Sequence, residues 1–288
     1  MKDFVIYTDS GCDIAPALLQ DWGVFACDLT FRFADEDKEF SNNEMEVKTF
    51  YDRMRAGGVA KTAAVNAERF RQAFAEQLAA GNDLLYIGFS SGLSTTFNSA
   101  RIAAEQIKEE YPEARVEVID SLCASAGQGM VVYLAAQKKK SGATLEETAA
   151  YCREILPSLC HWFTVDDLVY LKRGGRVSAT SAFVGNLLGI KPVLHVDDAG
   201  HLVPVTKVRG RRTALATMAE KYAATALDPK DGLVFISHAD CIADAEALAS
   251  MLKEKSGATV EIITDVGTVI GAHSGPGTLA LFFLGKER

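Results

Sequence analysis

Short apolar segments rich in β-forming residues alternate with amphipathic helical segments, and this alternation restricts the possible folds more than any other feature. In the first half, Asn66 precedes a helical segment whose apolar residues repeat every four positions, as an N-cap would. Thr144 and Glu147 have the spacing of a capping box that opens a further helix. The predicted strands of this half are Phe4–Thr8, Val24–Phe33, Leu84–Phe89 and Val116–Ile119. Strands separated by helices connect through βαβ crossovers, so we expect an α/β fold with a mainly parallel, buried sheet.

The second half has a different pattern, because a hairpin stands next to crossover elements. Two predicted strands, Pro192–Val196 and Leu202–Val208, flank the turn-forming residues 197–200. A predicted strand precedes this hairpin, at His161–Val165. After it come predicted helices at Arg211–Leu227 and Ala243–Lys255 and predicted strands at Leu233–Ser237 and Val260–Thr264. Hairpin and crossover together predict a mixed sheet. Because 288 residues are enough for about two domains, we expect one domain at 1–155 and another at 156–288.

Charge and cysteine usage exclude several classes of protein. The net charge of −8 argues against a nucleic-acid-binding protein, which needs a basic surface. The six cysteines lack the spacing of a zinc site or a disulfide framework. We expect neither a metal nor a cofactor. The opening residues lack a signal-peptide pattern, and residues 279–284 are too few to cross a bilayer, so a cytoplasmic protein without an integral membrane segment is expected.

The segment from Ser90 to Asn98 concentrates hydroxyl groups between a predicted strand and a predicted helix. Ligands of open α/β sheets bind at the carboxyl ends of strands, and a helix N-terminus attracts anions. Ser91, Gly92 and Ser94 therefore predict a carboxylate or phosphate site. A purely structural interpretation is equally open, in which Ser94 caps the helix and Gly92 forms a turn.

The same segment contains a possible catalytic serine. Residues 88–92 fit the G-x-S-x-G pattern of a hydrolase nucleophile, with Asp265 and His273 following in hydrolase order. However, no oxyanion-hole segment precedes Ser90, and only about two strands do. A serine esterase that uses Ser90 is the alternative hypothesis.

Polar residues at other predicted strand ends receive structural or binding interpretations. Asp13, which precedes Ile14-Ala15-Pro16, is expected to cap the next helix. His273 lies in a glycine-rich stretch, residues 271–278, which predicts a turn where backbone can approach a ligand. Arg173 and Arg176 surround a glycine pair, as in a helix C-terminus or an exposed anion-binding patch.

Taken in order, these segments resemble the DegV family of bacterial fatty-acid-binding proteins. The matching motifs extend over almost the whole chain, at Thr8-Asp9-Ser10, Lys61-Thr62, Ser90–Ser94, Asp120-Ser121, Leu171–Arg176, Lys191-Pro192 and Gly271–Thr278. Family members often have Thr-Ser-Gln-Pro-Ser after the loop lysine, where this chain has Thr62-Ala63-Ala64-Val65-Asn66. This difference keeps the threonine and changes its neighbours.

The resemblance implies a three-layer N-terminal domain, a mixed C-terminal domain and a long-chain fatty acid bound between them. It implies a carboxylate held by Thr62 and Ser94, with Ser91 and Gly92 in the same loop and His273 nearby. It further implies a separate fatty acid kinase as partner, faced by Arg173 and Arg176. Because the sequence contains no nucleotide-binding glycine loop, we expect a lipid-binding protein without catalytic activity of its own.

Overall fold

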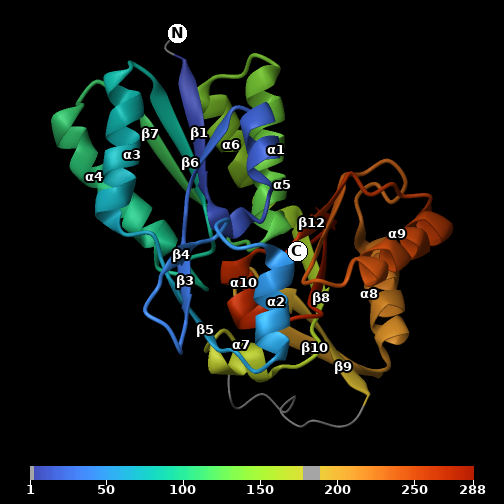
Figure 1. The fold of residues 1–288 in the computed structure, drawn as a ribbon. Coiled ribbons are helices and arrows are strands. Elements are labelled where there is room, and N and C mark those ends of the chain that lie inside the picture. The colour runs from blue at the N-terminus through green and yellow to red at the C-terminus, as the bar shows by residue number, and fades with distance from the viewer. Residues whose placement is uncertain (1–2, 178–188) are drawn as a thin grey trace.

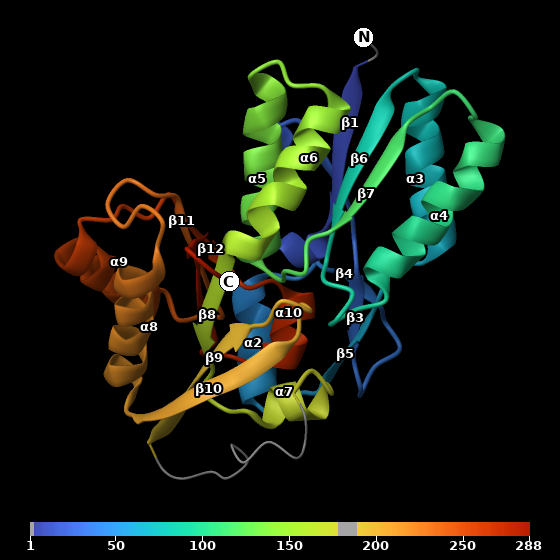
Figure 2. The same ribbon diagram turned by 180° about the vertical axis from the view of Figure 1, so that it is seen from behind.

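The computed structural model describes residues 3–177 and 189–288, and its first half forms three layers, helices–sheet–helices (Figures 1 and 2). Four parallel strands lie in the order β2-β1-β6-β7. Their bounds are β1 (Phe4–Asp9), β2 (Val24–Cys27), β6 (Asp83–Gly88) and β7 (Val116–Asp120). One face carries α3 (Ala67–Ala79) and α4 (Thr96–Glu110), and the other carries α1 (Pro16–Asp21), α5 (Ala126–Lys140) and α6 (Leu145–Ile155). The predicted α/β class and parallel sheet are confirmed.

Strand β6 shows why this sheet needs helices on both faces. Leu84 and Tyr86 belong to the core beneath α3 and α4, whereas Leu85 and Ile87 belong to the core beneath α5 and α6. All four side chains are fully buried. A strand with two buried faces has a continuous apolar sequence, as observed here.

The two predicted helix starts are confirmed. Asn66 accepts a hydrogen bond from the Arg69 N–H at 2.9 Å and caps α3. Thr144 and Glu147 each bond the other's backbone N–H, which makes a complete capping box at α6. Each cap satisfies N–H groups that a helix leaves without partners.

The prediction of one strand over Val24–Phe33 is wrong, because the chain changes sheet at Asp28 and Leu29. Strand β2 pairs with β1, whereas β3 (Thr30–Phe33) pairs antiparallel with β4 (Phe40–Ser41) and β5 (Ala60–Ala63) in a separate sheet. The bend is held from outside the segment, since the Leu29 N–H donates to Ser10 Oγ at 2.9 Å. No local glycine or proline marks it. Helix α2 (Val47–Arg55) packs on this small sheet through Phe50.

The second half forms a six-stranded mixed sheet in the order β10-β9-β8-β13-β11-β12. Only β11 and β12 pair in parallel, and the predicted hairpin of β9 and β10 is confirmed. Helices α8 and α9 cover one face, and the other face turns toward α5 (Figure 2). The bounds are β8 (Leu159–Thr164), β9 (Ile190–Val196), β10 (Leu202–Arg209), α8 (Arg211–Thr225), β11 (Val234–His238), α9 (Ile242–Ser256), β12 (Ile262–Asp265) and β13 (Leu279–Leu284).

Short helices complete the described part of the chain. They are the 3-10 helices η1 (Ser10–Cys12) and η2 (Leu156–Ser158) and the α-helices α7 (Val169–Arg173) and α10 (Thr268–Ser274). Helix α10 was expected to be part of a glycine-rich turn. Its Gly271 serves close packing, because a Cβ there would lie 2.2 Å from the Tyr51 hydroxyl. Within residues 3–177 and 189–288, no helix has the length and apolar character needed to cross a bilayer.

The small sheet and α2 belong to the first half in sequence and pack on α10 from the second half. The Tyr51 hydroxyl donates to the Val266 carbonyl at 2.7 Å. The Asn42 backbone carbonyl accepts from the Thr268 hydroxyl, and its side-chain oxygen accepts from the Val269 N–H. These contacts are buried. The proposed division into 1–155 and 156–288 stays a prediction.

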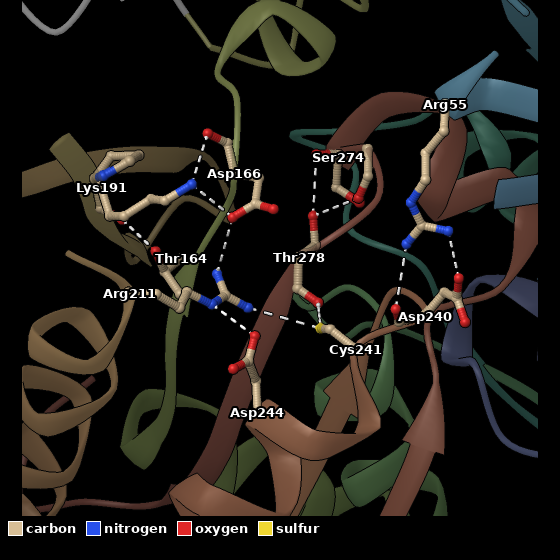
Figure 3. A network of polar contacts seen from close by, with 12 residues as sticks. Arg55, Thr164, Asp166, Lys191, Arg211, Asp240, Cys241, Asp244, Ser274 and Thr278 are labelled. Carbon is tan, nitrogen blue, oxygen red and sulfur yellow. Dashed lines mark hydrogen bonds and ion pairs between the residues drawn. The ribbon is translucent and has the colours of Figure 1, made fainter. Parts of the chain in front are cut away.

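Ion pairs connect loops at one end of the strands of the mixed sheet (Figure 3). Arg211, at the start of α8, donates to Asp244 at 2.9 Å and lies 3.7 Å from Asp166. Arg55, at the end of α2, bonds Asp240 in the loop after β11. The second of these pairs is another link between the small-sheet region and the second half.

The prediction that Asp13 caps a helix is wrong. Helix α1 begins after Ala15, which makes no side-chain cap. Asp13 instead adopts a left-handed backbone conformation, φ 50°, at the end of η1, and its side chain is buried. Neither carboxylate oxygen has a hydrogen-bond partner among the described residues.

Candidate functional site

A cavity of about 260 Å³ lies between the carboxyl ends of the parallel strands and the mixed sheet. The loop after β6 contributes Phe89, Leu93 and Ser94, and the loop after β7 contributes Ala124 and Ser125. Much of the remaining wall is apolar, with Phe163, Leu171, Leu202, Val269, Ala280 and Phe282. A mostly apolar cavity with a few polar groups is typical of a small-molecule site.

Thr62 and His273 meet at this cavity, although 211 positions separate them. Strand β5 supplies Thr62 and α10 supplies His273, and Thr62 Oγ1 lies 2.8 Å from His273 Nε2. Burial, and then the charge of Arg176, lower the pKa of His273 to about 4. The imidazole is therefore neutral at pH 7, and it can donate a hydrogen bond but cannot neutralise an anion.

Ser94 lies in the cavity wall at the start of α4. Its Oγ accepts from the Thr96 N–H at 3.2 Å and lies 2.9 Å from Thr96 Oγ1. Thr95, the N-cap residue, also lines the cavity and makes no side-chain cap. The positive end of a 15-residue helix thus faces the same region, which favours an anion there.

Arg176 provides a cationic side chain in the cavity wall. Its Nε donates to the Leu93 carbonyl at 3.0 Å, and its Nη1 donates to the Gly174 carbonyl at 2.5 Å. Burial lowers the pKa of Arg176, but a guanidinium remains protonated at neutral pH. Arg173, by contrast, is exposed at the end of α7, with its guanidinium 5.7 Å from the Tyr170 ring centre.

Ser91 and Gly92 lie outside the cavity wall as far as the described residues define it. Ser91 is exposed, and its N–H donates to Asp120 at 3.2 Å. Gly92 packs on the turn of the β9–β10 hairpin, where a Cβ would lie 2.8 Å from the Ala199 carbonyl oxygen. The structure thus brings together Thr62, Ser94 and His273 but not these two.

Ser90 is fully buried, and its hydroxyl is bonded to the backbone. Its hydroxyl donates to the Gly200 carbonyl at 2.9 Å and accepts from the Gly92 N–H. Within the described ranges no hydrogen bond connects Ser90 with His273. Asp265, the third member of the hypothetical triad, lies 3.6 Å from His238 instead.

Asp9 orders the loop that follows β6. Its carboxylate accepts from the Tyr86 hydroxyl at 2.7 Å, from the Phe89 N–H at 2.9 Å and from the Gly11 N–H at 3.0 Å. Phe89 is part of the cavity wall. Asp9, at the end of β1, therefore helps to position Phe89 in the cavity wall.

Sequence reasoning did not identify the polar residues His161, Ser125 and Ser237 of the cavity wall. Ser125 donates to Ser237 at 2.9 Å. His161 lies between Leu159 and Phe163 on the same face of β8, and these two apolar residues belong to the core. A histidine on an otherwise apolar strand face was the available signal.

Comparison with known proteins identifies the family of this chain. The family model described as an uncharacterised protein of the DegV family matches residues 3–286. A DegV domain-containing protein of Clostridium perfringens is 42% identical over 291 residues, which cover 100% of this chain and 99% of that protein.

Solved structures give the same family. A DegV lipid binding protein from Thermotoga maritima superposes with a TM-score of 0.88 at 31% identity, with 100% of both chains covered. A DegV family protein from Thermus thermophilus, described by its fatty acid binding, has a TM-score of 0.88 at 28% identity, covering 98% of this chain and 99% of that one.

Proposed function

This chain belongs to the DegV family, and from that premise we propose that it binds one long-chain fatty acid in the cavity. The carboxylate is held beside Thr62, Ser94 and His273, and the acyl chain occupies the apolar part. One observation carries the proposal: the described wall of the mostly apolar cavity contains the contacting pair Thr62 and His273, the Ser94 hydroxyl and the cationic Arg176. The fatty acid binding described for the Thermus thermophilus relative supports the choice of ligand.

The polar group suits a carboxylate in three respects. Hydroxyls donate hydrogen bonds without adding charge, and the neutral His273 donates another. Arg176 supplies the positive charge that a partly buried carboxylate requires. The first turn of α4 adds a favourable dipole. In this arrangement the charge is balanced by Arg176, and His273 orients the headgroup.

The apolar wall accounts for the affinity. Burial of each methylene contributes about 0.8 kcal/mol, so about a dozen methylenes contribute on the order of 10 kcal/mol. This contribution exceeds about 4 kcal/mol, the lower estimate of the free energy that association costs in lost translational and rotational freedom. The tail therefore provides most of the binding free energy, and the headgroup contacts provide orientation.

Denaturing extraction followed by mass spectrometry tests the proposal. The purified protein should release about one long-chain fatty acid per chain, and delipidated protein should take up added oleate or palmitate. A double variant, Thr62→Val with Ser94→Ala, should weaken retention, whereas Ser91→Ala, outside the cavity, should not. Extraction of no fatty acid, together with no uptake, would refute fatty acid binding in this cavity.

We further propose that the protein presents the bound carboxylate to a separate fatty acid kinase. The support is local: Arg173 is exposed on α7, and the same segment supplies Leu171 and Arg176 to the cavity wall. A kinase could thus contact the surface next to the headgroup. Arg173→Met should reduce kinase-dependent acyl-phosphate formation while leaving fatty acid retention unchanged. Equal turnover by this variant would remove Arg173 from the interface.

The esterase alternative has a direct test. Because the Ser90 hydroxyl bonds a backbone carbonyl, a fluorophosphonate probe should not label it. Labelling that disappears in Ser90→Ala would favour hydrolysis over binding.

A further inference from the structure

One polar side chain in the cavity wall has no function in gripping a carboxylate. His161 lies on β8, opposite Phe282 of β13, and their rings meet edge to face with centres 5.3 Å apart. Only 3% of the residue is exposed. Neither ring nitrogen has a hydrogen-bond partner among the described residues. A buried polar group without a partner is destabilising, so its presence here requires a reason.

The backbone of α5 packs directly against one side of this ring. Gly127, in the first turn of α5, faces it, and a Cβ at that position would lie 2.2 Å from His161 Nε2. Any other residue at 127 would therefore displace the imidazole. Glycine is otherwise unfavourable inside a helix, which fits a position where close approach to the histidine matters.

Its neighbours do not satisfy the ring. Across β13, the other polar wall residue of this sheet face is Ser237, which pairs in register with Ala280 and already bonds Ser125. Two strand spacings of about 4.8 Å and an offset of two residues at about 3.3 Å each place the Ser237 Cα roughly 12 Å from the His161 Cα. The serine pair is thus satisfied on its own and lies too far away to complete the imidazole.

The charge state of the ring defines what it can bind. Burial, and then the charge of Arg288, lower the pKa of His161 well below its ordinary value, and the nearby Leu159 carbonyl, which is not within hydrogen-bond geometry, offsets only part of this effect. The ring is neutral at pH 7 and offers one N–H donor and one acceptor nitrogen. A hydroxyl, which both donates and accepts, can bond whichever ring nitrogen faces the cavity, in either tautomer of the ring. A second carboxylate could accept only from the single N–H, and in the described ranges no hydrogen bond joins the ring to a cationic side chain.

Building on the proposed fatty acid site, we infer that His161 forms a second polar subsite within the acyl cavity, which selects long-chain fatty acids carrying a hydroxyl group on the chain. An unsubstituted chain would leave both ring nitrogens without partners. A hydroxyl at the matching position gains a buried hydrogen bond, which corresponds to about tenfold in affinity.

The test uses delipidated protein and competition against a fluorescent fatty acid. The competitors are stearate, a positional series of monohydroxystearates and a long-chain dicarboxylic acid. One hydroxyl position should bind about tenfold more tightly than stearate, and the diacid should gain nothing. In His161→Phe, the affinity for the preferred hydroxystearate relative to stearate should fall about tenfold, so that the two become equal. His195→Phe is the matched control, because His195 stacks on Trp162 on the neighbouring strand and does not line the cavity in the described part of the chain.

Two further measurements keep the inference open to refutation if His161→Phe does not fold. His161→Leu is a smaller replacement, and ring-nitrogen NMR of the unaltered protein should report a change at His161 with the preferred hydroxystearate but not with stearate. Equal affinity for every positional isomer and stearate would overturn the role of His161 while leaving fatty acid binding intact. Failure of all these competitors to bind would instead refute the proposed function.

Discussion

Replacing Asp13 by asparagine should stabilise this protein, and the stabilisation should grow as the pH rises. Burial, followed by the charges of Asp265 and Asp9, raises the pKa of Asp13 to about 8, against an ordinary value of 3.8. The Ser125 hydroxyl and the Gly267 N–H lie nearby without hydrogen-bonding the carboxyl, and they offset only part of this effect. The carboxyl is thus protonated in the folded protein at pH 7 and ionised in the unfolded chain.

The sign follows from proton binding. The folded state holds a proton that the unfolded state has already released above its ordinary pKa, so the free energy of unfolding falls as the pH rises from about 4 to about 8. The two pKa values of Asp13 differ by about 4 units, which corresponds to a ceiling of about 6 kcal/mol at about 1.4 kcal/mol per unit. Asparagine has the same size and no ionisable group, so it removes this loss.

Urea unfolding followed by circular dichroism, at several pH values between about 5 and 8, measures the effect. The difference in the free energy of unfolding between Asp13→Asn and the unaltered protein should grow by about 1.4 kcal/mol per pH unit. Other titrating groups are present in both proteins and cancel in this difference. Parallel pH profiles, or a difference that shrinks with pH, would refute a buried protonated Asp13.

Three further outcomes are expected. Arg176→Met should weaken oleate binding by about 2 kcal/mol, the contribution of a hydrogen bond to a charged group, whereas Arg173→Met should change the affinity less than twofold. Equilibrium dialysis measures both affinities, and equal losses would contradict the proposal that Arg176 balances the charge of the carboxylate. Because the pKa of His273 is lowered to about 4, oleate affinity should be constant between about pH 6 and 8, and a step near the ordinary histidine pKa would contradict a neutral ring. Gly271→Ala should lower the free energy of unfolding by about 1–3 kcal/mol, because the new Cβ would meet the Tyr51 hydroxyl. Thermal unfolding measures this loss, and adding Tyr51→Phe to the variant should restore part of it; unchanged stability of Gly271→Ala would show that the contact can relax.

Local patterns predicted the layered sheet but not every element. Strand β6 is apolar on both faces, which is a property of its own sequence, and the caps at Asn66 and Thr144 depend on residues within one turn. The break at Asp28 and Leu29 depends on Ser10 instead, and the helix at 268–274 depends on how closely Tyr51 approaches Gly271. Contacts of this kind join residues that are distant in sequence, so a pattern within one short segment cannot predict them.

The site shows the same division. The hydroxyl cluster around Ser94 was visible as a strand-to-helix junction, but the pairing of Thr62 with His273 came only from the family resemblance. The sequence indicated that Arg176 was cationic. It did not indicate that a backbone bond to Leu93 holds its guanidinium in the cavity wall.

The packing of the small sheet on α10 has a consequence for how such proteins can exchange segments during evolution. A recombination event between two relatives near residue 155 would take Asn42 and Tyr51 from one parent and their partners at residues 266–269 from the other. The cavity wall would be divided in the same way, since Thr62 and His273 come from opposite sides of the crossover. A viable chimera therefore has to inherit residues 42–62 and 266–273 together, although more than 200 positions separate the paired side chains.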